Sequence, residues 1–394
     1  MFEYFPDGPY TYNLGVVATL NSGGLIDEVD RACRPIKEAA AAGEDAGTPA
    51  FLRAWRTLTD QLVGQAEEAE KAGHTRTAGQ LWFRASNYLA QAERMLSHAN
   101  PDRVPTYRRM LELAQKAFDL HSPRVSRVAV PYEGTTLPAY FSQAPATDDG
   151  PAPVVVLVNG LDSTKEHMYA SNHWEELAAR GISCLMLDQP GTGEALRLQG
   201  LTARIDAEVW AGACIDWLET REDVDASRIG IVGWSLGGYY APRAAAFEKR
   251  FALCVAWGAN HDWGAVQRRR REREGERPVP HYWEHVLWVW GHSGDEEDLD
   301  AFLDFADDVR LDGVVEKISV PFLIAHGAND RQIPLAYAHR SYDQAVNSPK
   351  RELRVFTAEE GATEHIGLDH LSHVSTYIAD WVADTFAELA AARG

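Results

Sequence analysis

The sequence predicts an α/β protein with a mostly parallel, doubly wound sheet, preceded by a helical domain and interrupted by a helical cap. Between Leu25 and Leu120 there is almost no strand pattern, and apolar residues recur at helical spacing. Further along, short continuous apolar runs alternate with longer helical stretches, which is typical of a parallel sheet covered on both faces. A long helix-rich insertion follows one of these runs, between Trp257 and Ile318.

Length and composition fit a two-domain globular protein. The chain has 394 residues, of which 45% are hydrophobic and 24% are charged. No apolar run approaches the roughly 20 residues of a membrane span, and the acidic, aromatic N-terminus does not resemble a secretory signal. We therefore expect a cytoplasmic protein. Its formal charge of −20 disfavours nucleic acid and membrane surfaces as partners, because phosphate binding relies on clustered positive charge.

The cysteines indicate a reducing compartment. Three of the four lie in apolar segments, so we expect buried thiols rather than disulfides or a metal site; the four are Cys33, Cys184, Cys214 and Cys254. The sequence contains no metal-ligand cluster, phosphate-binding loop or dinucleotide fingerprint, and we expect no cofactor.

The N-terminal helical domain is predicted over residues 1–122. Helical patterns are separated by turn signals, which indicates three or four helices; the clearest patterns cover residues 51–73, 77–96 and 105–120. No fixed-period repeat accompanies them, so a solenoid is not predicted.

The catalytic domain is predicted over residues 123–394. It opens with a hairpin pattern over residues 124–144, in which apolar and polar residues alternate about a glycine-containing turn. Six apolar runs follow, at residues 153–160, 183–189, 228–235, 251–257, 321–327 and 352–357. Ligands of such sheets bind beyond the carboxyl ends of the strands. The cap insertion is placed at about residues 260–317.

A candidate nucleophile, Ser235, ends one of these runs. It lies in the pattern G-x-S-x-G, read as Gly233-Trp234-Ser235-Leu236-Gly237, with a predicted strand before it and a predicted helix after it. In a sharp strand-to-helix turn the neighbouring positions must be nearly free of side chains for the backbone to pass. The alternative is an ordinary glycine-rich turn.

A serine nucleophile needs a base and an acid that orients the base, in the chain order Ser, acid, His. Asp330 follows the apolar run 321–327 and is the candidate acid, although an Asx turn would also explain it. His365 follows the last apolar run in a glycine-bounded loop and is the favoured base. His370 and His373 are its rivals, but they enter the predicted final helix.

Two backbone amides are expected to bind the oxyanion. One is the amide of Leu236, which follows the nucleophile, and the other is the amide of Leu161, in the loop after the first long strand. Gly160 would let this loop approach closely, unless it is a plain turn glycine. Lys165 and Glu166 follow the loop and are expected to begin a helix in a structural role.

The cap insertion supplies candidate pocket residues. Aromatic side chains with a few polar groups are typical of ligand pockets; the candidates are His261, Trp263, Tyr282, Trp283, Trp288 and Trp290. The alternative for each is packing within the cap. The basic run Arg268–Arg277 is interpreted as a solvated helix face with internal Arg–Glu pairs, and the alternative is a site that attracts a carboxylate or phosphate of the substrate.

Several of these segments together resemble a known family: "VNGLDSTKEHMY", "LDQPGTGEA", "GWSLGGYYAPRAA", "HGANDRQIP" and "GATEHIG". They are similar to α/β-hydrolases with an N-terminal helical domain, typified by 2,6-dihydropseudooxynicotine hydrolase and by fungal polyketide-shortening hydrolases of melanin biosynthesis. The resemblance starts at about Glu28 and implies the α/β-hydrolase fold, a homodimer, and a triad at Ser235, Asp330 and His365. It also implies hydrolysis of a carbon–carbon bond beside a ketone. The family's cap carboxylate has no match here.

The expected function is therefore a serine-dependent hydrolase that cleaves a C–C bond adjacent to a ketone through an acyl-enzyme. Its substrate is expected to be a small molecule, an aromatic or polyketide-like β-diketone. The same triad would equally serve a carboxylester, thioester or amide hydrolase, or an acyltransferase. A non-enzymatic binding protein is the third alternative, and the intact candidate triad argues against it.

Overall fold

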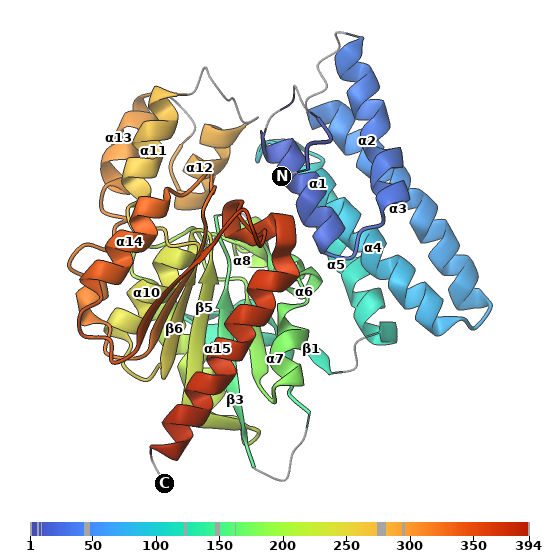
Figure 1. Cartoon of the computed structure of the whole chain (residues 1–394). Coiled ribbons are helices and arrows are strands. Elements are labelled where there is room, and N and C mark those ends of the chain that lie inside the picture. The colour runs from blue at the N-terminus through green and yellow to red at the C-terminus, as the bar shows by residue number, and fades with distance from the viewer. Residues whose placement is uncertain are drawn as a thin grey trace. The chain divides into compact units, whose positions relative to one another are not determined.

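The computed structural model describes residues 2–5, 8, 10–42, 48–121, 124–145, 150–161, 163–273, 281–293 and 296–392. The chain divides into two compact units. Residues 1–126 and 274–288 form a helical unit, and residues 127–273 and 289–394 form a unit built on a sheet (Figure 1). The second unit contains the three candidate triad residues of the sequence analysis and is called here the catalytic unit, after the predicted domain.

The helical unit contains antiparallel helices packed through apolar faces. Its elements are α1 (Tyr10–Asn21), α2 (Ile26–Ala41), α3 (Thr48–Lys71), α4 (Thr75–Arg94) and α5 (Arg103–His121). The largest buried side chains of the unit include Trp55 on α3, Trp82 and Tyr88 on α4 and Tyr107 on α5. The predicted helical region is therefore present. The sequence analysis missed α1, because its apolar residues do not gather on one face and give no helical period.

Part of the cap insertion belongs to the helical unit, which differs from its predicted placement in the catalytic domain. The helix α12 (Tyr282–Trp290) begins there, and the Glu284 carboxylate accepts a hydrogen bond from the Ser97 hydroxyl. The ring of Trp288 stacks on His98 at a centroid distance of 5.7 Å and lies 4.8 Å from the Arg103 guanidinium. Long-range contacts of this kind leave no periodic pattern in the sequence.

The catalytic unit is built on a mostly parallel sheet whose strands, among the described residues, are β1 (Val125–Tyr132), β2 (Thr135–Ser142), β3 (Ala152–Val158), β4 (Ser183–Leu187), β5 (Val224–Trp234), β6 (Leu253–Trp257), β7 (Phe322–Gly327) and β8 (Arg351–Phe356). Their order is β1-β2-β4-β3-β5-β6-β7-β8, and β2 runs antiparallel to β4. From β4 to β8 all pairs are parallel. Strands β3, β4, β6 and β7 and the second half of β5 are almost entirely buried, which explains their continuous apolar sequences.

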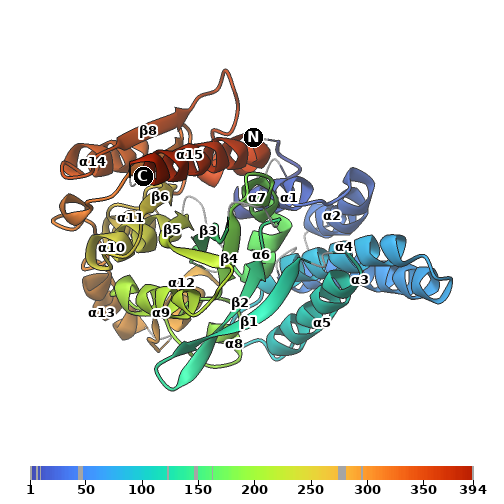
Figure 2. The same cartoon turned by 90° about the horizontal axis from the view of Figure 1, so that it is seen from below.

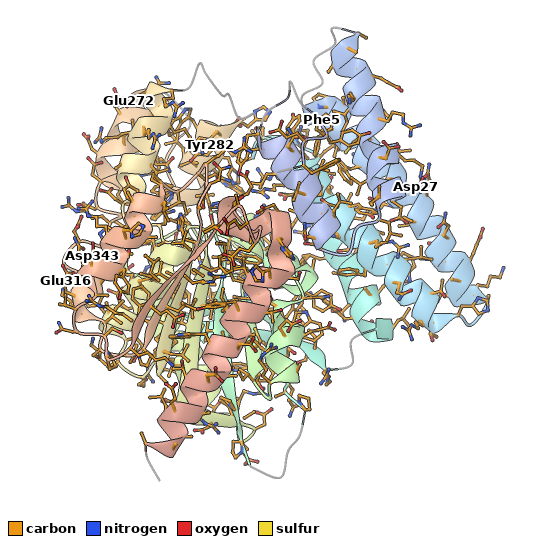
Figure 3. All side chains as sticks on the ribbon, in the orientation of Figure 1. Phe5, Asp27, Glu272, Tyr282, Glu316 and Asp343 are labelled. Atoms are coloured by element: carbon orange, nitrogen blue, oxygen red, sulfur yellow. The ribbon has the colours of Figure 1, made fainter. Side chains whose placement is uncertain are left out.

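Helices cover both faces of this sheet, as the doubly wound prediction requires. They are α6 (Lys165–Ala170), α7 (His173–Ala179), α8 (Gly193–Arg197), α9 (Ala207–Glu219), α10 (Gly237–Phe247), α14 (Leu335–Gln344) and α15 (Leu371–Ala391). One face carries α7 packed on α15, and the other carries α9 packed on α10 (Figure 2). Side chains fill the space between the helices and the strands (Figure 3). The α/β fold is therefore confirmed.

The rest of the cap insertion packs within the catalytic unit as α11 (Trp263–Glu272), α13 (Glu296–Ala306) and the short 3₁₀ helix η1 (Val315–Lys317). The Asp262 side chain caps α11 by accepting from the Ala265 N–H at 3.0 Å. A Cβ on Gly264 would lie 2.5 Å from the Ala306 carbonyl oxygen, so this glycine allows α11 and α13 to approach closely.

Two further expectations concern the thiols and the membrane. All four cysteines are free and buried, as predicted. Within the described part of the chain, no helix combines the length and the apolar character that a membrane crossing needs.

Candidate active site

Ser235 lies at a sharp turn between β5 and α10. Its φ of +57° falls in the left-handed region, which costs an L-residue other than glycine roughly 1–2 kcal/mol. The Ser235 N–H donates to the Trp257 carbonyl oxygen at 2.9 Å, and the Gly238 N–H donates back to the Ser235 carbonyl oxygen at 2.9 Å. These bonds hold the strained residue at the carboxyl edge of the sheet.

The glycines around Ser235 are required by close backbone contacts. A Cβ on Gly233 would lie 2.1 Å from the Gly237 carbonyl oxygen, and a Cβ on Gly238 would lie 2.0 Å from the Gly258 carbonyl oxygen. A Cβ on Gly237 would lie 2.7 Å from the carbonyl oxygen of Val158 on β3. The predicted reason for this glycine pattern, a turn with no room for side chains, is what the structure shows.

Ser235, His365 and Asp330 come together although they are far apart in the sequence. The Oγ of Ser235 lies 2.8 Å from His365 Nε2, and His365 Nδ1 lies 2.9 Å from Asp330 Oδ2. Asp330 Oδ1 accepts from the backbone N–H groups of Gln332 and Ile333 at 2.8 and 2.9 Å. One ring nitrogen of His365 thus faces the Ser235 hydroxyl and the other faces a fixed carboxylate, which is the arrangement that a serine–histidine–acid triad requires.

The carboxyl of Asp330 is buried but stays readily ionised. Burial raises its pKa, and the neighbouring His365 and the backbone donors outweigh that effect, so the pKa is held below its ordinary value. An ionised Asp330 accepts the Nδ1–H of His365, which leaves Nε2 free to accept the proton of Ser235.

The rival histidines lie elsewhere. His370 ends the short 3₁₀ helix η2 (His365–His370), and its ring lies 5.2 Å from that of His373. His373 packs edge-on against Phe356 at 5.3 Å and lies 3.7 Å from Glu360. Among the described residues, the histidine bonded to Ser235 is His365.

A buried carboxylate, Glu364, joins the loop of the acid to the loop of the base. Its side chain is 1% exposed and accepts from Asn329 Nδ2 at 2.9 Å and from the Arg331 guanidinium at 3.1 Å. Asn329 and Arg331 flank Asp330, and Glu364 precedes His365, so the clamp fixes both loops next to each other. Sequence reasoning missed it. The sequence did contain a signal for it, because polar residues stand directly beside both candidate residues, Asp330 and His365.

The expected oxyanion loop lies directly against the nucleophile. A Cβ on Gly160 would lie 2.9 Å from the Ser235 Cβ and 3.3 Å from its Oγ. Within the described residues, neither the Leu161 amide nor the Leu236 amide has an acceptor in the chain. Both are therefore free to donate to a bound oxygen, as the oxyanion hypothesis requires.

Ser163 ties this loop to the turn that carries Ser235. Its Oγ accepts from the Gly160 N–H at 3.1 Å and from Trp234 Nε1 at 3.0 Å, and it donates to Asn159 Oδ1 at 2.7 Å. Trp234 immediately precedes Ser235. The loop and the nucleophile are thus held by one hydrogen-bonded unit.

Two predicted pocket residues are occupied in packing within the catalytic unit. His261 is buried between Ser341 Oγ, 2.8 Å from Nδ1, and Asp312 Oδ1, 3.2 Å from Nε2. Trp263 packs on Trp290 and Phe302 at centroid distances of 5.3 and 5.8 Å. These contacts match the alternative, packing of the cap, and do not support a role in the pocket wall.

Trp290, the partner of Trp263, is likewise packed within the catalytic unit, and the three other cap candidates belong to the helical unit. Tyr282 and Trp283 pack on each other edge to face at 5.1 Å, and Trp288 packs on His98 as described. Their role as pocket residues stays a prediction. In the basic run, Arg268 pairs with Asp304 on α13 and with Asp307 just after it, whereas the expected pairs were Arg–Glu pairs within the run. Residues 274–277 lie outside the described residues.

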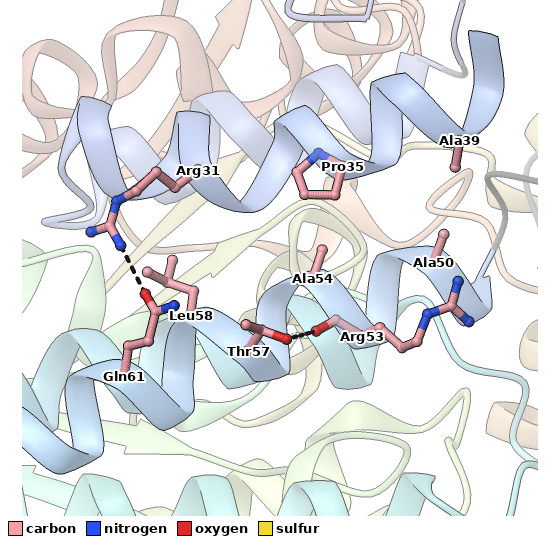
Figure 4. Close-up of a pocket in the computed structure, with 9 residues that line it drawn as sticks. All are labelled: Arg31, Pro35, Ala39, Ala50, Arg53, Ala54, Thr57, Leu58 and Gln61. Atoms are coloured by element: carbon pink, nitrogen blue, oxygen red, sulfur yellow. Dashed lines mark hydrogen bonds between the residues drawn. The ribbon is translucent and has the colours of Figure 1, made fainter. Parts of the chain in front are cut away.

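A separate hollow of about 500 Å³ lies between α2 and α3 in the helical unit (Figure 4). Its walls combine apolar residues such as Pro35 and Leu58 with Arg31 and Arg53. The Arg31 guanidinium donates to Gln61 Oε1 at 2.8 Å and to Asp27 Oδ2 at 3.0 Å, so this chain's own side chains engage it. The hollow contains no acid–base pair and gives no sign of chemistry.

Two family models match the chain. The model described as "Esterase FrsA-like" matches residues 51–266, and that of the prolyl oligopeptidase family matches residues 175–388. Among relatives, 2,6-dihydropseudooxynicotine hydrolase of Paenarthrobacter nicotinovorans is 28% identical over 340 residues, covering 84% of this chain and 83% of that protein. Hydrolase acrC of Aspergillus aculeatus is 32% identical over 292 residues, covering 68% of this chain and 66% of the relative.

The solved structures agree on the fold. A crystal structure of 2,6-dihydroxy-pseudo-oxynicotine hydrolase superimposes with a TM-score of 0.75 and 24% identity, covering 94% of this chain and 95% of the other. The structure of AbyA5 superimposes with a TM-score of 0.64 and 20% identity, covering 84% and 88%. Together with the half-chain matches of the family models, these findings show that the chain is an enzyme of the α/β-hydrolase family, similar to its FrsA-like esterases and to its prolyl oligopeptidases.

Proposed function

We propose that this hydrolase uses Ser235 as a nucleophile to cleave a carbon–carbon bond adjacent to a ketone, through an acyl-enzyme. The observation that carries the serine mechanism is the hydrogen-bonded chain from Asp330 through His365 to Ser235, with 2.9 and 2.8 Å between the successive pairs of atoms. The amides of Leu161 and Leu236, which have no acceptor among the described residues, support it, because a tetrahedral oxyanion needs such donors.

In the first half-reaction, His365 Nε2 removes the Ser235 proton and Oγ bonds to the ketone carbon, whose oxygen becomes an oxyanion. When the oxyanion collapses, the C–C bond breaks and its electron pair moves into the neighbouring carbonyl as an enolate. The His365 imidazolium returns its proton to the enolate carbon, and the leaving ketone departs. Asp330 stabilises the imidazolium throughout.

In the second half-reaction, His365 removes a proton from water, whose oxygen attacks the acyl carbon. The ester bond to Ser235 breaks, Oγ takes back the proton from His365, and a carboxylic acid is released. Because an enolate must leave, the substrate must carry a second carbonyl in conjugation with the bond that breaks. This requirement selects β-diketones or their vinylogues.

Similarity supports the choice of bond and substrate. The chain is similar over most of its length to 2,6-dihydropseudooxynicotine hydrolase and to several fungal hydrolases. The family resemblance of the motifs implies C–C hydrolysis beside a ketone in aromatic or polyketide-like compounds. We propose the same class of substrate for this chain.

A second candidate is hydrolysis of a carboxylic ester, which the esterase description of one matching family model favours. The triad geometry serves both reactions equally, since an alkoxide replaces the enolate as the leaving group. Hydrolysis in water labelled with oxygen-18 introduces label into the released acid in either case, whereas acyl transfer to another acceptor does not.

The test compares wild type with Ser235→Ala on an aryl β-diketone and on a p-nitrophenyl acyl ester, with products identified by mass spectrometry. Diketone cleavage that is lost in the variant supports the proposal. Ester cleavage without diketone cleavage replaces it with the second candidate. Undiminished activity of Ser235→Ala overturns the serine mechanism.

A further inference from the structure

A buried ionic cluster lies next to the oxyanion loop. It consists of Lys165, Glu166, Asp188 and Glu194 and is called here the Lys165 cluster. The Lys165 side chain is fully buried, and its Nζ lies 2.7 Å from Glu166 Oε1, 2.9 Å from Asp188 Oδ2 and 2.6 Å from Glu194 Oε1. An isolated buried ammonium costs several kcal/mol, and apolar packing at such a place is often at least as stable as an ion pair. Stability alone is therefore a weak explanation for the cluster.

The Asp188 carboxylate also binds the backbone that follows the oxyanion loop. Oδ1 accepts the Lys165 N–H at 2.7 Å, and Oδ2 accepts the Glu194 N–H at 2.9 Å. A Cβ on Gly193 would lie 2.0 Å from this carboxylate, so a glycine is needed for the backbone to close over it. An apolar side chain at position 188 would leave both buried N–H groups without acceptors.

The first residue of the oxyanion loop, Asn159, is held by residues at the carboxyl end of β4. The Asn159 N–H donates to Gln189 Oε1 at 3.2 Å, and Gln189 Nε2 donates to the Asn159 carbonyl oxygen at 2.9 Å. Asn159 Nδ2 donates to the Leu187 carbonyl oxygen at 2.8 Å. The Leu161 amide thus lies in a short segment that residues 187–189 hold at both ends.

Lys165 supplies the positive charge in contact with all three carboxylates of the cluster, while Arg127 contacts Glu194 alone, at 2.5 Å. Burial lowers the pKa of Lys165, but the three carboxylates outweigh burial and raise it above the ordinary value, so the amine stays protonated. Burial, together with the charge of Glu166, raises the pKa of Asp188 to about 6 against the attraction of Lys165. Without the ammonium, the three carboxylates would repel one another. This repulsion would weaken the hydrogen bond from the Lys165 N–H to Asp188.

We propose that Lys165 and Asp188 are positioning residues that hold the Leu161 amide where it receives the oxyanion. The proposal rests on the serine mechanism proposed above. It differs from a purely structural role in one respect: a loosened loop weakens binding of the tetrahedral oxyanion more than binding of the flat substrate, because only the oxyanion depends on that amide.

The test uses an aryl trifluoromethyl ketone, which adds to a serine hydroxyl and forms a tetrahedral adduct visible by ¹⁹F NMR. Its affinity is measured for wild type, Lys165→Met and Ser235→Ala. Lys165→Met is expected to bind the adduct about 10- to 100-fold more weakly and to lose kcat by the same factor, with KM unchanged.

Two further variants separate positioning from general damage. Tyr140→Phe removes the hydroxyl that donates to Glu166 Oε1 at 2.7 Å but leaves Lys165, Asp188 and their bonds to each other in place, and it is expected to keep wild-type adduct affinity. Gln189→Met removes the bonds to Asn159 without changing charge and is expected to behave like Lys165→Met. If near-UV circular dichroism shows that Lys165→Met does not fold, the adduct affinity of Gln189→Met is compared with wild type instead.

The outcomes distinguish this proposal from the one on which it rests. If wild type forms no adduct, or if Ser235→Ala forms one, the serine mechanism is wrong. If wild type forms the adduct and folded Lys165→Met and Gln189→Met bind it equally well, the positioning role is wrong. An equal loss in Tyr140→Phe also overturns the positioning role, because the effect would then be general.

Discussion

Gly160 lies so close to Ser235 that a Cβ added to Gly160 would be 2.9 Å from the Cβ of the serine. Real Cβ atoms do not approach this closely, so Gly160→Ala must displace either the oxyanion loop or the nucleophile. A displacement of about 1 Å in reacting groups costs on the order of 100-fold in rate. We expect Gly160→Ala to lose kcat/KM by at least that factor on whichever substrate the wild type cleaves.

The matched control is Gly64→Ala on α3, where a Cβ would meet open space. This variant is expected to keep wild-type activity and to gain about 0.5–1 kcal/mol of stability, because alanine is the better helix former. If Gly160→Ala retains wild-type activity in a folded protein, the oxyanion loop does not lie where the structure places it.

Ser235 itself offers a test of backbone strain. Its φ of +57° suits glycine, whereas Ser235→Ala keeps a side chain in the unfavourable region. Both variants are expected to be inactive, but Ser235→Gly should be more stable than Ser235→Ala by up to about 1 kcal/mol, after allowance for the greater entropy of glycine in the unfolded chain. Calorimetry of the two proteins measures the difference. A lower unfolding temperature for Ser235→Gly would show that the turn is not strained.

Asp330→Asn tests the orienting acid. The amide oxygen can still accept from the Gln332 and Ile333 backbone, but the amide cannot stabilise the His365 imidazolium as a carboxylate does. We expect kcat to fall by about 1,000- to 10,000-fold with little change in KM. Steady-state kinetics with a check of folding by circular dichroism measures this.

Asp312→Asn is the matched control for Asp330→Asn. Asp312 also faces a histidine, with Oδ1 3.2 Å from His261 Nε2, but neither residue contacts Ser235 in the described structure. Its activity is expected to stay within about twofold of wild type. A similar loss in both variants would mean that the effect of Asp330→Asn is not specific to His365.

The sequence was sufficient to predict those features that the residues of a single segment determine. The strands β3 to β7 are apolar on both faces, and the turn at Ser235 needs glycines on both sides, so both leave local patterns. Asp330 and His365 were found because each lies in the segment between a recognisable strand and the helix after it. Their mutual distance of 2.9 Å, however, is a property of the folded sheet.

Contacts between distant segments account for what the sequence did not reveal. The Glu364 clamp needs Asn329 and Arg331, more than 30 residues away, and the Lys165 cluster joins residues that follow β3 to residues that follow β4. Lys165 and Glu166 were expected to begin a helix, and they begin α6, but their burial had no signal in a charged dipeptide. Aromatic residues of the cap carry no mark that separates a pocket wall from a packed core, as Trp263 illustrates.

His173 makes stability depend on pH. Burial, with the ring packed against Trp257 at 5.2 Å, and the nearby charge of Arg180 lower the pKa of this side chain to about 3. The hydrogen bond with Ser375, whose Oγ lies 2.8 Å from Nδ1, acts in the opposite direction but is outweighed. The folded protein keeps His173 neutral, whereas the unfolded chain takes up a proton below a pKa of about 6.5, so folding becomes less favourable as the pH falls through that value.

Between pH 7 and pH 5 the cost to the free energy of unfolding is about 2 kcal/mol. His173→Asn removes the titrating group while an amide can still bond Ser375, so urea titrations at the two pH values should show a pH dependence smaller by about that amount. The variant as a whole is expected to be less stable at pH 7, because a buried ring is lost. His74→Asn, at an exposed site before α4, should leave the pH dependence as in wild type. If His173→Asn and wild type lose equal stability between pH 7 and pH 5, then His173 is not the buried neutral group that its surroundings imply.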